Sequence, residues 1–178
     1  MGRRAVFLDR DGVLNDAIIR DRRPYPPTNL QDIVIAADVE PALERLKRLG
    51  FVLLVVTNQP DVRRGSSSKD KVEAIHRFLA ERLPLDDFFV CYHDDGDKCL
   101  CRKPLPGLLI EAASQYAVDL NSSFLIGDRW RDIDAGAAAG CRTILIDRGY
   151  EERHPKVSPG AIVKSISEAA EWVSAQDV

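Results

Sequence analysis

Two carboxylates, Asp9 and Asp11, stand directly after the apolar run at positions 5–8, and Gly12 follows them. In an extended strand, residues two positions apart lie on the same face, and a glycine lets the backbone turn at once. We therefore expect both carboxylates to converge on one small volume at the tip of a buried strand. Their mutual repulsion is relieved by a cation or by a shared proton. The pair predicts a metal-assisted site in which one Asp is the nucleophile and the other transfers protons.

The same pattern is also compatible with an Asp-rich surface turn that caps the next segment. A calcium-binding loop does not fit the residues. Counted from Asp9, such a loop needs an oxygen ligand at position 13, a glycine at 14 and a glutamate at 20, where the chain has Val13, Leu14 and Arg20.

Hydroxyl and amide side chains follow a second apolar run, at positions 51–56. Thr57, Asn58 and Gln59 come directly after this run, and Arg63 and Arg64 lie in the polar loop beyond them. Beside backbone N–H groups, such side chains can hold phosphoryl oxygens. A plain turn is the alternative, because Thr and Asn favour turns in any case.

A third carboxylate and a lysine extend this set. Asp128 follows the apolar run 123–126 after one glycine, and Lys103 follows Arg102. Three carboxylates at two adjacent strand tips can hold Mg²⁺ together with water and phosphate. Lys103 can pair with Asp9 and with phosphate. Alternatively, Asp128 only caps the next helix. For Arg102 and Lys103, the alternative is an ordinary basic pair exposed to solvent.

Three of the four cysteines crowd into eleven residues together with a histidine. The four potential ligands are Cys91, His93, Cys99 and Cys101. One imidazole and three thiolates form a tetrahedral set for structural zinc, and no ligand position is left vacant for catalysis. The polar loop 94–98 between them has no core of its own, so a metal would give it order. A redox pair or buried thiols are the alternatives, and Cys141 is expected to be a small buried hydrophobe.

The composition is that of an ordinary globular protein, with 178 residues, 45% apolar residues, 30% charged residues and a net charge of −3. The length suits one domain over residues 1–178. The charge gives no reason to expect a nucleic-acid partner, although 25 Lys and Arg residues can gather around an anionic substrate. No apolar run approaches the roughly 18 residues of a membrane span, and the first run is too short for a signal peptide. We therefore expect no membrane contact and a cytoplasmic protein.

Apolar runs and helical periods alternate along the chain. The expected strands are 5–9, 51–57, 88–92, 123–126 and 143–146, and the expected helices are 38–50, 68–83, 105–117, 131–139 and 165–175. The stretches 16–30 and 148–161 show no periodicity and are expected to be irregular loops. This alternation predicts an α/β fold with a doubly wound parallel sheet. Ligands bind such sheets at the carboxyl ends of the strands, where Asp9 and Asp11 lie.

In their order along residues 4–149, the motifs resemble those of the haloacid-dehalogenase-like phosphohydrolases. They are Asp9-Arg10-Asp11-Gly12-Val13-Leu14-Asn15, Thr57-Asn58-Gln59, Arg102-Lys103-Pro104 and Gly127-Asp128. The Cys-x-His and Cys-x-Cys pairs narrow the resemblance to the subgroup of heptose bisphosphate and histidinol phosphate phosphatases. It implies a Rossmann-like core without a separate cap domain, Mg²⁺ dependence, a phosphoaspartyl intermediate and a small phosphorylated sugar or related metabolite as partner.

The resemblance also implies roles for individual residues. Asp9 would be the nucleophile, Asp11 the general acid/base, and Thr57 and Lys103 the holders of the transferring phosphoryl group. Asp9, the Asp11 backbone and Asp128 would bind Mg²⁺, while Asn58, Gln59, Arg102 and Arg129 would contact phosphate or sugar. Pro60-Asp61 replaces the Ser-Gly that heptose enzymes typically have, so this loop is expected to differ. Without a cap, substrate choice falls to the loops 16–30, 60–67 and 94–102, and the enzyme is expected to be a monomer.

Two non-enzymatic alternatives are open at this point. A phosphorylated signalling receiver also uses Asp, Thr and Lys on a doubly wound sheet. Its accepting Asp follows the third strand, however, where this chain has the Cys/His cluster. The other alternative is a zinc-stabilised binding module that has kept the fold. Turnover of a phosphate ester would separate both from a phosphatase.

Overall fold

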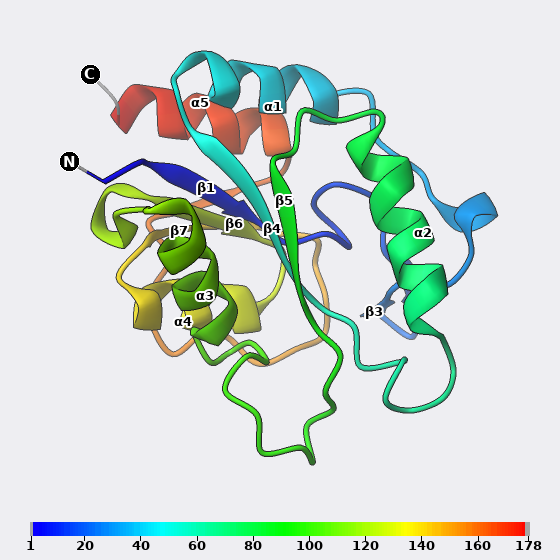
Figure 1. The fold of residues 1–178 in the computed structure, drawn as a ribbon. Helices are drawn as coiled ribbons and strands as arrows, with labels where there is room; N and C mark the ends of the chain where they lie inside the picture. Colours follow the sequence, from blue (N-terminus) through cyan, green and yellow to red (C-terminus); the bar gives the residue numbers. More distant parts are fainter. Residues whose placement is uncertain (1, 177–178) are drawn as a thin grey trace.

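Six parallel strands form the centre of the computed structural model, which describes residues 2–176 (Figure 1). Along the chain they are β1 (Ala5–Leu8), β4 (Val52–Asn58), β5 (Asp87–Cys91), β6 (Phe124–Gly127), β7 (Arg142–Ile146) and β8 (Ala161–Val163). In space their order is β5-β4-β1-β6-β7-β8. The winding direction reverses beside β1, so a crevice opens there at the carboxyl ends of the strands. The predicted doubly wound parallel sheet is confirmed.

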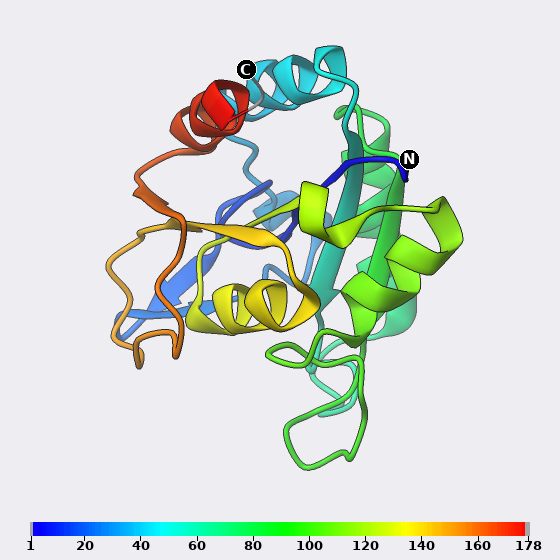
Figure 2. The same cartoon turned by 90° about the vertical axis from the view of Figure 1, so that its left-hand side faces the viewer.

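Helices cover both faces of this sheet (Figures 1 and 2). One face carries α1 (Val39–Arg48), α2 (Lys69–Ala80) and α5 (Ile166–Gln176), and the other carries α3 (Gly107–Tyr116) and α4 (Trp130–Ala139). Side chains of β1 alternate between two cores: Val6 and Leu8 pack under the first group of helices, and Phe7 packs under the second. Burial on both faces explains why the central strands are continuous apolar runs.

The stretch 16–30 is not the irregular loop that we predicted. It contains an antiparallel hairpin of β2 (Ile18–Arg20) and β3 (Arg23–Tyr25), followed by the short 3₁₀ helix η1 (Leu30–Asp32). The turn residues Asp21 and Arg22 have positive φ values of 48° and 58°. Two-residue hairpin turns need this backbone, but glycine or asparagine usually supplies it. The Asp-Arg pair therefore gave no turn signal in the sequence.

Two further boundaries differ from the prediction. The end of the predicted loop 148–161 enters a sixth strand, β8, which pairs in parallel with β7. The helix predicted at 105 begins at Gly107 instead, with Pro106 at its N-cap. By contrast, Ser68 begins α2 as predicted, and its hydroxyl accepts a hydrogen bond from the Lys71 N–H at 3.4 Å.

Between β1 and α1, the chain forms only the hairpin and η1. Within residues 2–176, no further folded unit stands over the carboxyl edge of the sheet. The fold therefore has the expected capless form. Over the same residues, no helix has the length and hydropathy required to cross a bilayer.

Candidate active site

Three buried carboxylates meet at the carboxyl edge of the sheet. Asp9 follows β1, Asp128 follows β6, and Asp132 lies in the first turn of α4. One oxygen from each lies within 4.8 Å of the others. The convergence of Asp9 and Asp128 follows from the parallel pairing of β1 with β6, in which Leu8 faces Ile126.

Asp132 joins the group because the chain folds back tightly at Gly127. A Cβ atom on Gly127 would collide with the Asp132 side chain, so only glycine permits this approach. The side chain of Asp132 also accepts a hydrogen bond from the Arg129 N–H at 3.0 Å, at the start of α4. Sequence reasoning gave this residue no role. The available signal was its place in the first turn of the helix that follows Asp128, because that helix begins at the same edge of the sheet.

Lys103 lies among these carboxylates and is itself almost completely buried. Its ammonium is 2.8 Å from Asp9 Oδ1 and 2.6 Å from Asp132 Oδ1, and it donates to the Val56 carbonyl at 2.7 Å. Burial acts to lower the pKa of Lys103, but the attraction of Asp132 and Asp9 outweighs it and raises the pKa above its usual range. Lys103 therefore stays protonated.

The charges of the site favour the binding of a divalent cation. Three carboxylates surround one ammonium, which leaves two negative charges. Burial raises the pKa of Asp9 to about 6, and it raises the pKa of Asp128 well above its ordinary value, with Asp9 and Asp132 adding repulsion. Asp128 Oδ1 is buried and has no hydrogen-bond partner. An unpaired carboxylate oxygen beside other carboxylates is the donor set that Mg²⁺ takes.

Asp11 lines the same cavity, but its carboxylate stands outside the compact group and is held by four donors. Arg10 donates to both of its oxygens at 3.0 Å, Asn15 donates to Oδ1 at 3.0 Å, and Gln59 donates to Oδ2 at 2.8 Å. These hydrogen bonds fix the orientation of the Asp11 side chain.

Arg10 and His76 lie beneath Asp11 and were not foreseen from the sequence. Arg10 is completely buried, and its Nη1 is 3.2 Å from Nε2 of His76, which stacks on Phe88 with 4.6 Å between the ring centroids. Burial, and then the charge of Arg10, lower the pKa of His76 to about 3. The ring is therefore neutral, and its nitrogen accepts the hydrogen bond, since a guanidinium only donates.

Thr57, Asn58 and Gln59, at the carboxyl end of β4, mainly support their neighbours. The Gln59 amide donates to Thr57 Oγ1 at 2.9 Å as well as to Asp11, and Gln59 is only 2% exposed. The Asn58 side chain donates to the Lys103 carbonyl at 3.0 Å and accepts from the Lys103 N–H at 3.1 Å. The structure thus brings Asn58 to the cavity wall and leaves Gln59 behind it.

A cavity of about 210 Å³ opens over the carboxylates. Side chains from five segments line it: Arg23 and Tyr25 from the hairpin, Asp61 and Arg64, Asp95 and Arg102, Arg129 and Arg131, and Glu152. The three loops predicted to choose the substrate all contribute. Five arginines and Lys103 line the cavity beside six carboxylates, so guanidinium groups are available there to bind an anionic molecule.

Arg102 and Arg129 both lie at this cavity, and each is fixed by an acidic partner. Arg102 Nε donates to Asp95 Oδ1 at 2.9 Å, and its Nη1 donates to the His93 carbonyl at 3.2 Å. Arg129 Nε donates to Glu152 Oε2 at 3.0 Å. Arg63 does not line the cavity and instead pairs with Asp97 at 3.2 Å.

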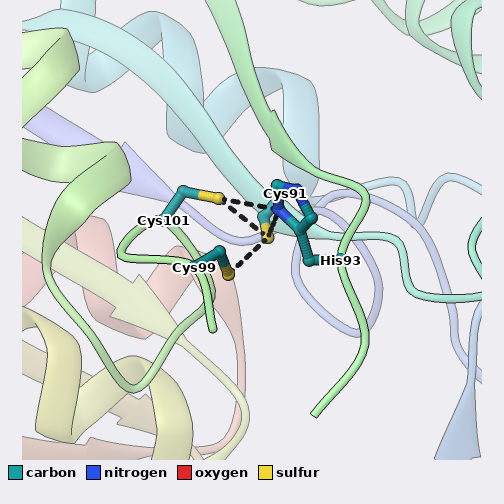
Figure 3. A group of neighbouring side chains, drawn as sticks. All are labelled: Cys91, His93, Cys99 and Cys101. Carbon is teal, nitrogen blue, oxygen red and sulfur yellow. Dashed lines mark hydrogen bonds between the residues drawn. The ribbon is translucent and has the colours of Figure 1, made fainter. Parts of the chain in front are cut away.

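The four predicted zinc ligands form a second compact group (Figure 3). Cys91 Sγ is 3.9 Å from Cys99 Sγ and 3.1 Å from Cys101 Sγ, while His93 Nδ1 is 3.3 Å from Cys101 Sγ. Two thiolates bound to one tetrahedral zinc at about 2.3 Å each lie about 3.8 Å apart, so the spacing suits a single ion. All four cysteines are free thiols, and Cys141 is buried in the core as expected.

Comparisons with known proteins agree with this geometry. A family model described as HAD-hydrolase-like matches residues 100–169. The chain is 31% identical over 178 residues to the D-glycero-beta-D-manno-heptose-1,7-bisphosphate 7-phosphatase of Helicobacter pylori, covering 96% of this chain and 97% of the relative. It is 36% identical over 159 residues to the enzyme of the same name from Pasteurella multocida, covering 83% of each chain.

A solved structure extends the similarity to three dimensions. The crystal structure of D,D-heptose 1,7-bisphosphate phosphatase from B. bronchiseptica, complexed with magnesium and phosphate, superposes with a TM-score of 0.81 at 29% identity. The matched region includes 97% of this chain and 99% of the crystallised chain. The chain therefore belongs to the haloacid-dehalogenase-like phosphatases, the family that also contains these relatives. It is a phosphoric monoester hydrolase.

Proposed function

We propose that this enzyme removes the 7-phosphate from D-glycero-D-manno-heptose 1,7-bisphosphate, with Mg²⁺ as cofactor and a phosphoaspartyl intermediate on Asp9. The observation that carries the proposal is the near-full-length similarity to heptose-bisphosphate phosphatases. The arginine-lined cavity supports it, because a bisphosphate presents a second anion some distance from the one that is cleaved.

The cation would be held by the carboxylates of Asp9 and Asp128 and by the Asp11 backbone. Asp128 Oδ1, buried and without a partner, supports this assignment. When bound, Mg²⁺ supplies positive charge that neutralises phosphoryl oxygens during transfer. Lys103 adds a fixed ammonium on the same side, and Thr57 offers a hydroxyl. Asn58, Gln59, Arg102 and Arg129 keep their proposed places around phosphate and sugar, with Gln59 acting through Thr57 and Asp11.

The reaction needs two steps at Asp9. In the first, an Asp9 oxygen attacks phosphorus in line as the bond from phosphorus to the sugar oxygen breaks. Asp11, in its protonated form, donates its proton to that departing oxygen. In the second, the Asp11 carboxylate takes a proton from water as the water oxygen attacks the phosphorus. The bond from Asp9 to phosphorus then breaks, which releases inorganic phosphate and restores the Asp9 carboxylate, while Asp11 is again protonated for the next cycle.

The Cys/His group would hold a structural zinc ion. The support is the close approach of Cys91, His93, Cys99 and Cys101, whose donor atoms all lie within 4.8 Å of one another. Zinc there would order the loop that carries Asp95 and Arg102 to the cavity. Free thiols at this cluster suit a reducing compartment, so we keep the proposal of a cytoplasmic enzyme, to be checked by localisation of the tagged chain. The proposal of a monomer is separate and is to be checked by light scattering.

A phosphate-release panel tests the substrate. The panel contains heptose 1,7-bisphosphate as both anomers, histidinol phosphate and a hexose bisphosphate, with kcat/KM measured for each in the presence of Mg²⁺. We expect the heptose bisphosphate to be hydrolysed best, and ³¹P NMR to show loss of the 7-phosphate signal. A higher kcat/KM for another member of the panel would overturn the substrate, and no turnover of any ester would overturn the mechanism.

Histidinol phosphate is the second candidate. The departure at Pro60-Asp61 and the short loop between His93 and Cys99 favour it, because both change the cavity wall relative to the typical heptose enzymes. Its positively charged amine would need an acidic partner, and Asp61 and Asp95 line the cavity. The same panel decides between the two substrates.

A further inference from the structure

The segment 148–152, called the strap below, follows β7 and crosses the active site. Arg148 donates two hydrogen bonds to the Gly12 carbonyl, at 3.1 and 2.9 Å. Glu152 pairs with Arg129, and the Glu151 N–H donates to the Arg22 carbonyl at 3.0 Å. The strap therefore touches the loop after β1, the start of α4 and the hairpin, although none of its residues was foreseen as part of the site.

Tyr150 is the strap residue that reaches the carboxylates. Its hydroxyl donates to Asp128 Oδ2 at 2.7 Å. Directly beneath this contact lies Gly12, whose φ is +87°. A Cβ atom on Gly12 would collide with the Asp128 carboxylate and stand 3.0 Å from the Tyr150 hydroxyl. Asp128 is thus confined between Tyr150 and the backbone at Gly12, in the loop that follows β1.

The two oxygens of Asp128 have different surroundings as a result. Oδ2 is engaged by Tyr150, whereas Oδ1 is buried and has no partner. A carboxylate free to rotate could turn either oxygen toward Lys103 or toward solvent. One fixed hydrogen bond on Oδ2 leaves Oδ1 as the unpartnered oxygen of a carboxylate that lies beside Asp9 and Asp132.

We propose that Tyr150 is the positioning residue of the Mg²⁺ site: it fixes the Asp128 carboxylate so that Oδ1 is presented to the cation. The inference rests on the proposed function insofar as Mg²⁺ is the ion held at Asp9 and Asp128. Outer partners that orient a metal ligand typically contribute 10–100-fold to metal affinity. Tyr150 bonds Asp128 rather than Asp9 and does not line the cavity, so its effect should appear in metal binding rather than in the chemical step.

The test compares Tyr150→Phe with Tyr116→Phe in the zinc-loaded full chain. Tyr116 makes a similar contact, donating to Asp87 Oδ2 at 3.0 Å, on α3 and outside the cavity lining. Mg²⁺ is titrated calorimetrically into each protein in the absence of substrate. Tyr150→Phe is expected to raise the Mg²⁺ dissociation constant by about 10-fold or more, and Tyr116→Phe is expected to leave it unchanged.

The activity readout separates positioning from general damage. For Tyr150→Phe, the Mg²⁺ concentration that gives half-maximal rate should rise in parallel with the dissociation constant, while kcat at saturating Mg²⁺ stays within about twofold of the parent. An unchanged Mg²⁺ dissociation constant would overturn the inference, as would a loss of kcat that Mg²⁺ does not restore. Failure of the parent chain to bind Mg²⁺ would instead refute the metal assignment in the proposed function, and a different preferred substrate would leave the inference standing.

Discussion

The Lys103 ammonium lies 2.6 Å from Asp132 Oδ1, and both side chains are only 2% exposed. Buried ion pairs lose much of their Coulomb attraction to desolvation, so a pair at this position is weak evidence for stability as such. The pair instead fixes geometry, because Asp132 holds the Lys103 ammonium beside Asp9. Lys103 is then shared between the two carboxylates and does not pair with Asp9 alone.

Replacing Asp132 by Asn should weaken both the fold and the reaction. Removing Asp132 leaves the buried Lys103 ammonium with the Asp9 carboxylate in place of two carboxylates, which should cost about 3 kcal/mol of unfolding free energy. Lys103 should then be drawn closer to Asp9, which lowers kcat/KM. Denaturant unfolding and steady-state kinetics measure the two effects. Glu171→Gln, in an exposed pair with Arg45 at 3.9 Å, is the control and should change neither. Equal behaviour of the two variants would contradict the role of Asp132.

Asn substitutions should separate the two roles at the tip of β1. Asp9→Asn is expected to abolish turnover, because an amide is a poor nucleophile and a poor metal ligand. Asp11→Asn should still bind Mg²⁺, since only its backbone is proposed as a ligand, but kcat should fall by about 10²–10⁴-fold for want of a proton donor. Calorimetry with Mg²⁺ and single-turnover kinetics report the two properties. A near-normal rate in Asp9→Asn would exclude the covalent intermediate.

His76 should make the fold sensitive to acid. Its folded pKa of about 3 lies below the ordinary value of 6.5, so the unfolded chain binds the proton more readily. The contribution of the neutral ring is present above pH 6.5 and is lost as the pH falls toward 3. Between pH 6.5 and 4.5 the loss amounts to about 2 kcal/mol. A glutamine at this position can still accept a hydrogen bond from Arg10 but does not titrate. Between pH 6.5 and 4.5, the unfolding free energy of His76→Gln should therefore fall by about 2 kcal/mol less than that of the parent protein. Identical slopes for the two proteins would refute the assignment.

Elemental analysis should find one zinc ion per chain. Because structural zinc contributes directly to folding free energy, its removal should lower the melting temperature and the activity together. Cys99→Ser is expected to behave like the chelated protein. Cys141→Ser is the matched control, since Cys141 is a free thiol in the apolar core outside the cluster. Zinc-free protein that melts at the same temperature and keeps its activity would rule the site out.

Arg102→Ala should discriminate between substrates with one and two phosphates. A guanidinium fixed by Asp95 and the His93 carbonyl can bind a second phosphate bidentately. We expect kcat/KM for the bisphosphate to fall by about 1.5–3 kcal/mol, with a much smaller loss for a simple monophosphate ester. Arg63→Ala, outside the cavity, should affect neither. Equal losses on both substrates would make Arg102 a part of the zinc-loop scaffold instead.

The parts of the fold that could be predicted are those in which local pattern and burial agree. The run Leu53–Val56 is completely buried, and its unbroken apolar sequence identifies a central strand. The strand β8 has no such signal, because it has three residues and Ile162 is 64% exposed. The hairpin was missed for a different reason, since its turn uses Asp21 and Arg22 where glycine is usual.

The same division applies to the site. Asp9 and Asp128 could be predicted because each follows a strand whose end lies at the carboxyl edge, so topology brings them together. Lys103 lies in a loop and was identified through the Arg102-Lys103-Pro104 motif. Tyr150 and His76 could not, because their contacts depend on the path of an irregular loop and on how a helix packs. No spacing rule in a single sequence encodes either of these.

The ion pairs between loops have an evolutionary consequence. Arg64 of one substrate-facing loop pairs with Asp94 of the zinc loop, and Arg22 of the hairpin pairs with Glu151 of the strap at 2.8 Å. A charge reversal in one loop would therefore leave an unmatched charge in its neighbour. Such loops should diversify as linked pairs, so that positions 64 and 94, or 22 and 151, covary among descendants of this enzyme while the sheet beneath them stays unchanged.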